Sequence, residues 1–380
     1  MTTTITNEHK KLNVPNLRFP EFQGEWKKCI LGDITENFNL RNKDKIQYPM
    51  FSVTNDRGFV PQSEQFEGRD MVGEDIKAYK IIHSNDFAYN PARINVGSIA
   101  MYTGEKPCMI SSLYVCFKTT KEVNNEWLMQ LLKTPKMNYY YNVNGEGGVR
   151  VYLFYPNFAR IRMSIPKIEE QKKIAKLLNL IDERIATQNK IIDKLQSLIK
   201  GIAQHCIREL INGWEYVRLS DICKITTGKL DANAQVENGQ YPFFTCAERP
   251  FNIDSYAFDT EALLISGNGA NLGYINYYKG KFNAYQRTYV LDHFSVNIQY
   301  VKWALKVLLP KRIAIEKSSS NTPYIVLSTL ADLKIPIPNN SKQNHIANLM
   351  QSFEGELSNQ LALNDLYNKQ KQYLLRQMFI

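Results

Sequence analysis

The side chains of this sequence that could carry chemistry are guanidinium, ammonium and amide groups gathered in short predicted loops. The stretch Tyr89–Asn95 alone holds an aromatic ring, two amides and a guanidinium. Lysine and arginine neutralise phosphates, arginine also reads guanine, and asparagine or glutamine reads adenine in the major groove. Loops of this composition favour a partner that offers both phosphates and base edges.

The candidate DNA-binding residues share amide or cationic groups, lie in predicted loops and fall into two sets. The set in the first half of the chain is Arg41, Lys43, Lys45, Asn90, Arg93, Asn95, Asn144 and Arg150. The set in the second half is Lys229, Arg249, Asn268, Asn271, Gln286, Arg287, Lys317 and Asn321. For any one of them, a solvated loop side chain is the alternative interpretation.

The motifs that are typical of catalysis and metal binding are absent or incomplete in this sequence. No Gly-x-x-x-x-Gly-Lys-Ser/Thr loop occurs, and the five histidines and six cysteines show no metal-ligand spacing. Asn90-Pro91-Ala92 is similar to the Asn-Pro-Pro-aromatic motif of DNA amino-methyltransferases but lacks its second proline and its aromatic residue. Glu170-Gln171-Lys172 has the letters of a nuclease motif but opens a predicted exposed helix. We therefore predict no catalytic residue, no metal site and no cofactor on this chain.

Composition and charge limit the class of protein. A length of 380 residues predicts two or three domains, and a hydrophobic fraction of 44% is ordinary for a folded protein. The formal net charge of +10 and the sequence pI of about 9.1 favour a polyanionic partner, although many proteins are simply basic. Because no signal peptide, disulfide framework or long apolar run is visible, we expect a cytoplasmic protein with reduced thiols.

The sequence contains an internal duplication. Residues 151–195 align without a gap on residues 323–367, so that Tyr152 falls on Tyr324 (324 − 152 = 172) and Gln171 on Gln343. Trp26 likewise matches Trp214 at an offset of 188 (214 − 26 = 188). A period this long is a duplicated unit of globular domain plus helix rather than a solenoid repeat. Two similar binding surfaces predict a partner with two parts.

The duplication predicts a mixed α+β fold of two similar globular domains and two long helices. The predicted segments are an N-terminal arm at 1–25, globular domains at 26–167 and 213–338, and helices at 168–212 and 339–380. A separate helix is expected around Glu126–Tyr141. Apolar residues recur every 3.5–3.6 positions in both long helices, so we expect them to pack antiparallel as a coiled-coil stalk with a domain at each end. Gln188 and Gln360 hold equivalent places in the two apolar stripes and either fix the register or are exposed.

With these features in view, the chain resembles the DNA-specificity subunits of type I restriction–modification systems over nearly its whole length. The resemblance rests on Glu25-Trp26 and Gly213-Trp214, on Leu-x-Asp-Ile at 31–34 and 219–222, on the helix entries at 165–174 and 335–346, and on the run Asn90–Ile99. The second copy has Ser266-Gly267-Asn268-Gly269 where the first has Asn90-Pro91-Ala92-Arg93. Divergence at this place is expected if each domain reads a different half-site.

The resemblance implies a non-catalytic reader of double-stranded DNA with an asymmetric, bipartite target. The stalk would set the gap between half-sites and recruit two methyltransferase subunits, and restriction/translocase subunits would join through them. S-adenosylmethionine, ATP and magnesium would then belong to those partner subunits. The alternatives are a small fused nuclease or methyltransferase, which would need a cofactor loop or an acidic cluster, and a coiled-coil scaffold without a role in DNA binding. Binding to random-sequence duplex DNA separates the three.

Overall fold

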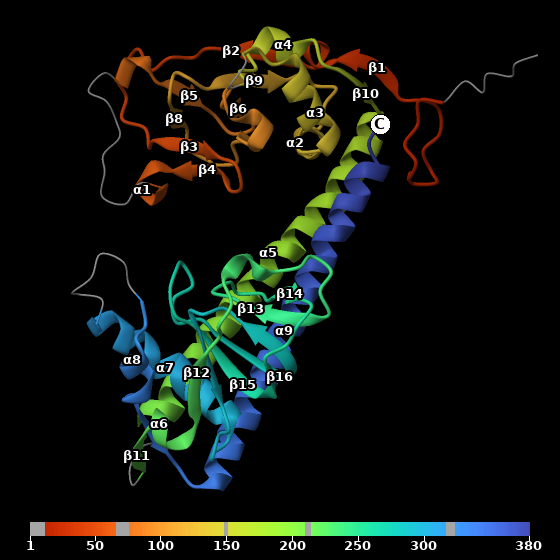
Figure 1. Cartoon of the computed structure of the whole chain (residues 1–380). Coiled ribbons are helices and arrows are strands. Elements are labelled where there is room, and N and C mark those ends of the chain that lie inside the picture. The colour runs from red at the N-terminus through yellow and green to blue at the C-terminus, as the bar shows by residue number, and fades with distance from the viewer. Residues whose placement is uncertain (1–11, 66–75, 148–150, 210–213, 317–323) are drawn as a thin grey trace, which may run out of the picture. The chain divides into compact units, whose positions relative to one another are not determined.

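The computed structural model describes residues 12–65, 76–147, 151–209, 214–316 and 324–380 (Figure 1). The chain divides into two compact units. The first comprises Met1–Thr187 with Asn364–Ile380, and the second comprises Gln188–Leu363. Each long helix therefore contributes one part to each unit, and the two units are described separately below.

The first unit is built on antiparallel sheets and short helices. Its strands are β1 (Lys27–Ile30), β2 (Thr35–Phe38), β3 (Phe51–Thr54), β4 (Gly58–Pro61), β5 (Lys80–Ile82), β6 (Phe87–Tyr89), β7 (Ile99–Met101), β8 (Cys108–Ile110), β9 (Val115–Thr119) and β10 (Arg162–Ile165). Its helices are α1 (Gln62–Gln65), α2 (Asn125–Leu132), α3 (Pro135–Asn144), α4 (Tyr155–Ala159), the start of α5 (Ile168–Gln204) and the 3₁₀ turns η1 (Leu31–Asp33), η2 (Ile76–Ala78) and η3 (Ile94–Val96).

The strands of the first unit form a four-stranded sheet in the order β2-β9-β6-β7 and the pairs β3-β4, β5-β8 and β1-β10. Strand β6 (Phe-Ala-Tyr) is buried on both faces, with Phe87 stacked on Phe117 at a centroid distance of 4.9 Å. The main core joins Trp26, Trp127 and Phe158 to the first turns of α5. This core supports the loop that leaves β6 at Asn90.

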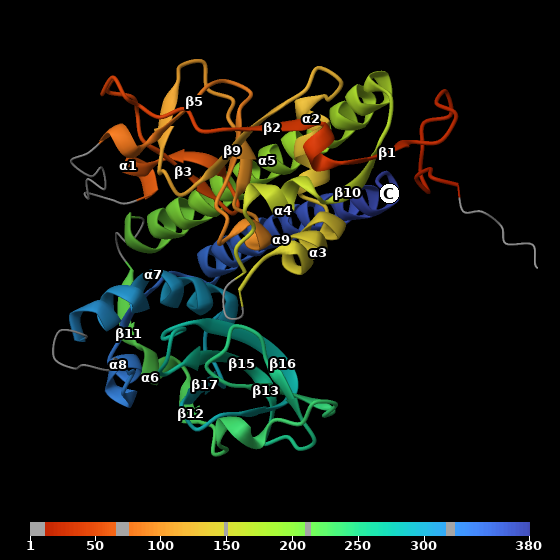
Figure 2. The ribbon, with the colours of Figure 1, turned by 90° about the horizontal axis from the view of Figure 1, so that it is seen from above.

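The second unit repeats the plan around a larger sheet. Its strands are β11 (Glu215–Arg218), β12 (Lys224–Thr227), β13 (Tyr241–Phe244), β14 (Phe251–Ile253), β15 (Phe258–Ser266), β16 (Ile275–Ala284), β17 (Thr288–Asp292) and β18 (Lys334–Ile337). Its helices are α6 (Leu219–Ile222), the 3₁₀ turn η5 (Ala232–Ala234), α7 (Ile298–Glu316), α8 (Leu327–Ala331), most of α9 (Asn340–Gln377), and a π-helical turn, His205–Glu209, that follows α5. Six strands pair in the order β12-β17-β15-β16-β13-β14. Figure 2 labels β12, β13, β15, β16 and β17 of this sheet.

The duplication is visible in the strand pairing. Lys27 of β1 pairs with Ile165 of β10, and Glu215 of β11 pairs with Ile337 of β18. These partners match at the offsets of 188 and 172 read from the sequence. In each copy the first strand therefore pairs with the last one, so that the globular part closes on itself immediately before the long helix begins.

Helices α5 and α9 lie side by side and antiparallel within each unit (Figures 1 and 2). In the first unit, Lys371 pairs with Asp182, and Arg184 donates from Nε to the Tyr367 hydroxyl at 2.8 Å. In the second unit, Gln188 donates from Nε2 to Oε1 of Gln360 at 2.5 Å. Gln188 is 5% exposed and Gln360 is half-buried, so burial is confirmed for Gln188 alone, and a role of the pair in fixing the register stays a prediction.

The prediction of one continuous helix around Glu126–Tyr141 is wrong. The structure has α2 and α3 instead, separated at Lys133-Thr134. Thr134 has extended backbone angles and accepts the Met137 N–H with its side chain, and Pro135 occupies the first position of α3. A proline at that position and a threonine before it start a new helix more favourably than they continue an old one.

The start of each long helix is held by one glutamine. Gln171 donates to the Pro166 carbonyl at 2.9 Å and accepts the backbone N–H of Asn124 at 2.8 Å. Its equivalent Gln343 donates to the Pro338 carbonyl at 2.8 Å and accepts the backbone N–H of Asn297 at 3.0 Å. Both are about 98–99% buried. The same side chain thus joins the long helix to the cap of α2 in one copy and of α7 in the other.

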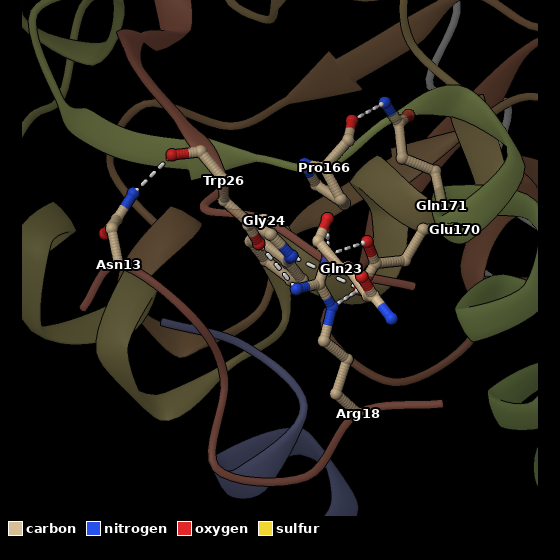
Figure 3. Close-up of polar contacts among 8 residues, drawn as sticks. All are labelled: Asn13, Arg18, Gln23, Gly24, Trp26, Pro166, Glu170 and Gln171. Atoms are coloured by element: carbon tan, nitrogen blue, oxygen red, sulfur yellow. Dashed lines mark hydrogen bonds and ion pairs between the residues drawn. The ribbon is translucent and has the colours of Figure 1, made fainter. Parts of the chain in front are cut away.

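The arm before β1 contacts Glu170, whose equivalent in the second copy is Lys342. Glu170, in the first turn of α5, accepts from Nε and Nη2 of Arg18 at 2.8 and 2.7 Å and from Trp26 Nε1 at 3.2 Å (Figure 3). Arg18 also donates to the Gly24 carbonyl at 2.6 Å, and Asn13 donates to the Trp26 carbonyl at 2.6 Å. Residues 12–25 are therefore a packed part of the first unit.

Candidate nucleic-acid interface

Equivalent polar loops follow equivalent strands in the two units. In the first, the loop after β6 is closed by the Asn90 N–H bonded to the Ser98 carbonyl at 3.0 Å. In the second, the loop after β15 is closed by the Ser266 N–H bonded to the Tyr274 carbonyl at 3.0 Å. Gly97 and Gly273 adopt positive φ angles of 102° and 81°, which only glycine adopts readily. We call these segments, Asn90–Ser98 and Ser266–Tyr274, the first and second β-turn loops.

The first β-turn loop presents a mixture of structural and available side chains. Asn90 accepts the Ala92 N–H at 3.0 Å with its side-chain oxygen and so closes the turn. Arg93 is exposed. Asn95 donates to the side-chain oxygen of Asn142 on α3 at 3.0 Å. Asn144, at the end of the same helix, donates to the Tyr140 carbonyl at 2.9 Å. The structure thus brings Asn95 to the exposed face of α3, with Arg93 two residues away.

The cationic residues Arg41, Lys43 and Lys45 lie on another loop of the first unit. Arg41 forms an isolated β-bridge with Lys80 of β5. Asn42 is fully buried and shapes the loop, since its side chain donates to the Ile46 carbonyl at 2.7 Å and accepts the Ile46 N–H at 3.1 Å. Lys45 takes a positive φ of 53°, and all three cations are exposed. This is an electropositive loop held in one conformation by a buried amide.

In the second unit, five predicted residues converge at one end of the sheet. Gln286 donates its backbone N–H to the Leu230 carbonyl at 2.9 Å, beside Lys229. The Arg287 carbonyl accepts the Gly267 N–H at 2.8 Å, beside Asn268. Asn271 donates to the Cys246 carbonyl at 3.1 Å, and the Cys246 thiol donates to Asn268 Oδ1 at 3.0 Å. We call Lys229, Asn268, Asn271, Gln286 and Arg287 the second-unit cluster.

The members of the second-unit cluster differ in availability. The side chains of Lys229, Gln286 and Arg287 are exposed, whereas Asn268 and Asn271 are half-buried and already bonded to Cys246. Arg249 is exposed three residues beyond Cys246 on the same loop. Burial raises the pKa of Tyr289, and the positive charge of Arg287 partly opposes this rise. The Tyr289 phenol therefore stays protonated and donates to the Ile325 carbonyl at 2.9 Å.

Three predicted residues, Arg150, Lys317 and Asn321, lie outside the described residues. The remaining thirteen stay predictions as DNA contacts.

Sequence reasoning missed several polar residues around the first β-turn loop. A cavity of about 480 Å³ opens beside it and is lined by Asn55, Asn95, Asn138 and Lys133, among others. The carbonyl of Asn55, on the β3–β4 hairpin, lies so close to Gly97 that a Cβ there would approach it to 2.9 Å. Asn138 and Asn142 are one helical turn apart on α3, and this i, i+4 spacing is the signal that could have singled them out.

The described residues hold no group of three or more histidine, cysteine, aspartate or glutamate side chains placed to bind a metal ion. None of the described helices is long and apolar enough to span a membrane.

Known proteins resemble this chain in sequence and in fold. The family model for the type I restriction modification DNA specificity domain matches it twice, at residues 24–197 and 211–364. The EcoDI specificity subunit of Escherichia coli is 45% identical over 134 residues, which are 35% of this chain and 30% of that protein. The MjaIX specificity subunit of Methanocaldococcus jannaschii is 25% identical over 278 residues, which are 63% of this chain and 64% of that protein. The chain thus spans less than two thirds of either relative.

Solved structures share the fold at low identity. The S subunit of a type I restriction–modification system from M. genitalium superposes with a TM-score of 0.65 at 15% identity, covering 97% of this chain and 99% of that one. A chain solved in a study of assembly and conformational transition of a type I system superposes with a TM-score of 0.58 at 16% identity, covering 92% and 96%.

Proposed function

The chain belongs to the family of type I restriction modification DNA specificity domains, and from that premise we propose that it reads the target of a type I restriction–modification complex in double-stranded DNA. The observation that carries the proposal is the doubled domain, because each copy presents its own polar loop on the same local framework. The loops differ in side chains while the closing hydrogen bonds are kept. Each unit then reads its own half-site, and the target is bipartite and asymmetric.

The chemistry of the loops is suited to duplex DNA. Exposed Arg93 in the first unit and Arg287 with Gln286 in the second offer the groups that pair with guanine and adenine in the major groove. The loop of Arg41, Lys43 and Lys45 offers charge for phosphates. A net charge of +10 adds the long-range attraction that speeds encounter with a polyanion.

We further propose that the chain is not itself an enzyme. Its Asn90 side chain closes a turn on Ala92 rather than standing free, and the sequence has no phosphate-binding loop. S-adenosylmethionine, ATP and magnesium would be bound by two methyltransferase subunits and by restriction/translocase subunits that assemble with this chain in the cytoplasm. Calorimetric titration of the folded chain with S-adenosylmethionine should give no binding heat, and measurable binding would refute this part.

Selection from a random duplex pool by the purified chain tests the reading role. The enriched duplexes should share two short, different segments separated by a fixed gap of unselected bases. Six to ten phosphate contacts would lower affinity by about 10³–10⁵ between 50 and 200 mM salt. Enrichment of one continuous motif would contradict the bipartite model, and an absence of enrichment would contradict DNA reading.

The lengths of α5 and α9 can be changed to test whether these helices set the gap between the half-sites. Both α5 and α9 pass without a break from one unit to the other. Four residues inserted after Ala186 and four more after Ala362 would lengthen both helices between the contacts Arg184–Tyr367 and Gln188–Gln360, and so keep both contacts. The added rise is about 6 Å, with a rotation of about 40°.

If the helix pair lies along the duplex, this insertion should lengthen the gap by one or two base pairs and leave both half-sites unchanged. Two base pairs match the added rise, at about 3.4 Å each, and one matches the added rotation, at about 34° each. An insertion in α5 alone is the matched control, since it breaks one of the two helix contacts and should lower stability. A folded double insertion with altered half-site letters and the original gap would refute the spacing role. Sequencing of methylated bases in cells carrying the system reads the outcome.

A further inference from the structure

In a DNA-binding protein built from two copies of one unit, the residues that serve both copies can be distinguished from those that serve only one. Exposed residues that differ between the copies are available to read different bases, whereas exposed residues that are identical meet a partner common to both units, either the DNA backbone or a methyltransferase subunit. Most identical pairs between residues 152–195 and 324–367 are buried or half-buried, as are Gln171 with Gln343, and Ile174 with Ile346. Those pairs are explained by the fold.

Tyr152 and Tyr324 are identical, equivalent and exposed. Their exposed fractions are 37% and 56%. The residues around them have changed, since Phe154 is replaced by Val326 and Tyr155 by Leu327. The other exposed identical pair of this stretch, Asp193 and Asp365, is acidic and lies on the long helices. The Tyr152 ring stacks on Phe154 with a centroid distance of 6.2 Å, yet both tyrosines stay more than one third exposed among changing neighbours, and this calls for an external partner.

Both tyrosines are tied to the polar loops by the same backbone hydrogen bond. The N–H of Leu153, next to Tyr152, donates to the Pro91 carbonyl in the first β-turn loop at 2.9 Å. The N–H of Ile325, next to Tyr324, donates to the Gly267 carbonyl in the second β-turn loop at 2.8 Å. Each tyrosine therefore stands beside the residues that we propose to read bases, at the same point of the framework.

We propose that Tyr152 and Tyr324 are sequence-independent contacts to the DNA backbone, one in each unit, that hold the adjacent loop in register on its half-site. This inference rests on the proposed DNA-reading function. The sugar–phosphate backbone is the part of DNA that is common to two different half-sites, and tyrosine hydroxyls are among the groups that donate to phosphate oxygens. Within the described parts of the chain neither hydroxyl has a hydrogen-bond partner, so both can donate to a phosphate oxygen.

Phenylalanine substitutions test the role without removing the ring. Tyr152→Phe, Tyr324→Phe and the double variant of the full chain are titrated by fluorescence anisotropy with the duplex enriched in selection and with a scrambled duplex. Tyr373→Phe in the first unit and Tyr216→Phe in the second are matched controls, because both tyrosines are exposed, at 55% and 51%. Circular dichroism and thermal melting confirm that every variant folds.

Each single substitution should lower the affinity for both duplexes by the same factor. We expect about a tenfold loss, the value of one hydrogen bond to a charged oxygen. The double variant should lose about the product of the two factors. The slope of log affinity against log salt should stay unchanged, because a neutral phenol releases no counterion, whereas loss of a lysine or arginine contact lowers the slope by about one. The controls should bind like the original chain.

Other outcomes overturn the inference in distinguishable ways. Loss confined to one base position of the selected duplex would make the tyrosines base readers. Unchanged DNA binding with weakened capture of methyltransferase subunits would assign them to a protein surface. Unchanged binding in both assays would leave them without an interaction role. If the original chain binds neither duplex, the proposed function itself fails, and the inference with it.

Discussion

Removal of Arg18 should destabilise the first unit by much more than the loss of a surface cation. The Glu170 carboxylate, 2% exposed, is held by two hydrogen bonds from Arg18 and one from Trp26 Nε1 (Figure 3). In Arg18→Ala the Glu170 carboxylate stays buried, and of these three hydrogen bonds only the one from Trp26 Nε1 remains. Removing one partner of a buried pair costs about 3–5 kcal/mol. Because the Arg18 side chain is itself 17% exposed, we expect about 3 kcal/mol.

The chain offers its own matched control. The residue equivalent to Glu170 in the second copy is Lys342, whose Nζ lies 5.9 Å from the centre of the Trp214 ring. Lys342 is exposed, so Lys342→Ala should change stability by less than about 0.5 kcal/mol. A second control is Glu170→Gln, which removes the buried charge. In that background Arg18→Ala should cost only about 1 kcal/mol, the value of an ordinary hydrogen bond.

Amide hydrogen exchange in increasing urea measures the effect, because it resolves the two units separately. The exchange of α2 and of the start of α5 should accelerate in Arg18→Ala, while amides of α7 stay unchanged. The reasoning is refuted if Arg18→Ala and Lys342→Ala change stability equally. It is also refuted if Arg18→Ala costs the same with Glu170 as with Gln at position 170.

Three further outcomes are expected. Arg93→Ala should relax specificity at one half-site position by about 1–3 kcal/mol in duplex selection, and equal weakening on all sequences would make Arg93 a phosphate contact. Burial alone would raise the pKa of Glu354, but hydrogen bonds from Lys302 and Lys306 hold it below its ordinary value of 4.5. The ionised Glu354 therefore stabilises the fold above about pH 4.5, and this stabilisation is lost as pH falls through the pKa of the folded state. The free energy of unfolding in urea should depend less on acid pH in Glu354→Gln than in the original chain. An equal pH dependence in the two proteins would contradict this prediction. Burial raises to about 12 the pKa of the thiols of Cys108, Cys116 and Cys223, so mass spectrometry should find them unmodified by iodoacetamide at pH 8 until the chain is denatured, and rapid labelling of the native protein would contradict this.

The long helices and the doubled plan could be predicted because they depend on periodic, local patterns. An apolar stripe without proline predicts α5 and α9, and the repeated offset predicts that β1-β10 and β11-β18 pair alike. The break between α2 and α3 is also encoded locally, in Thr134-Pro135, although we expected one continuous helix there. The six-stranded order of the second unit depends on pairings distant in sequence, such as β13 with β16, for which the sequence holds no local signal.

The candidate site divides in the same way. Residue type and loop position were enough to select Arg93, Gln286 and Arg287, which the structure leaves exposed. Whether an amide is available depends on its neighbours in space. Asn90 is used within its own turn, and Asn268 is bonded to Cys246 across 22 residues, so both have structural partners that spacing could not reveal. Asn55 and Asn138 border the cavity beside the first β-turn loop only because the chain folds them together.

The two copies differ most informatively at Glu170 and Lys342. Both occupy the first turn of a long helix beside an equivalent tryptophan, yet one carries a buried anion and the other an exposed cation. A carboxylate near a helix N-terminus is favourable, but burying it requires a cation, and residues 12–25 supply that cation as Arg18. At the equivalent position the second copy has Lys342, which is exposed and needs no counter-ion. Packing of the arm and burial of Glu170 are therefore coupled. Glu170→Lys should release residues 12–25 from the first unit, and limited proteolysis should then cut the arm first. An arm as resistant as in the original chain would show that the packing of Phe19 on the core and the hydrogen bond from the Leu17 N–H to the Gln377 carbonyl, at 2.9 Å, hold it without the ion pair.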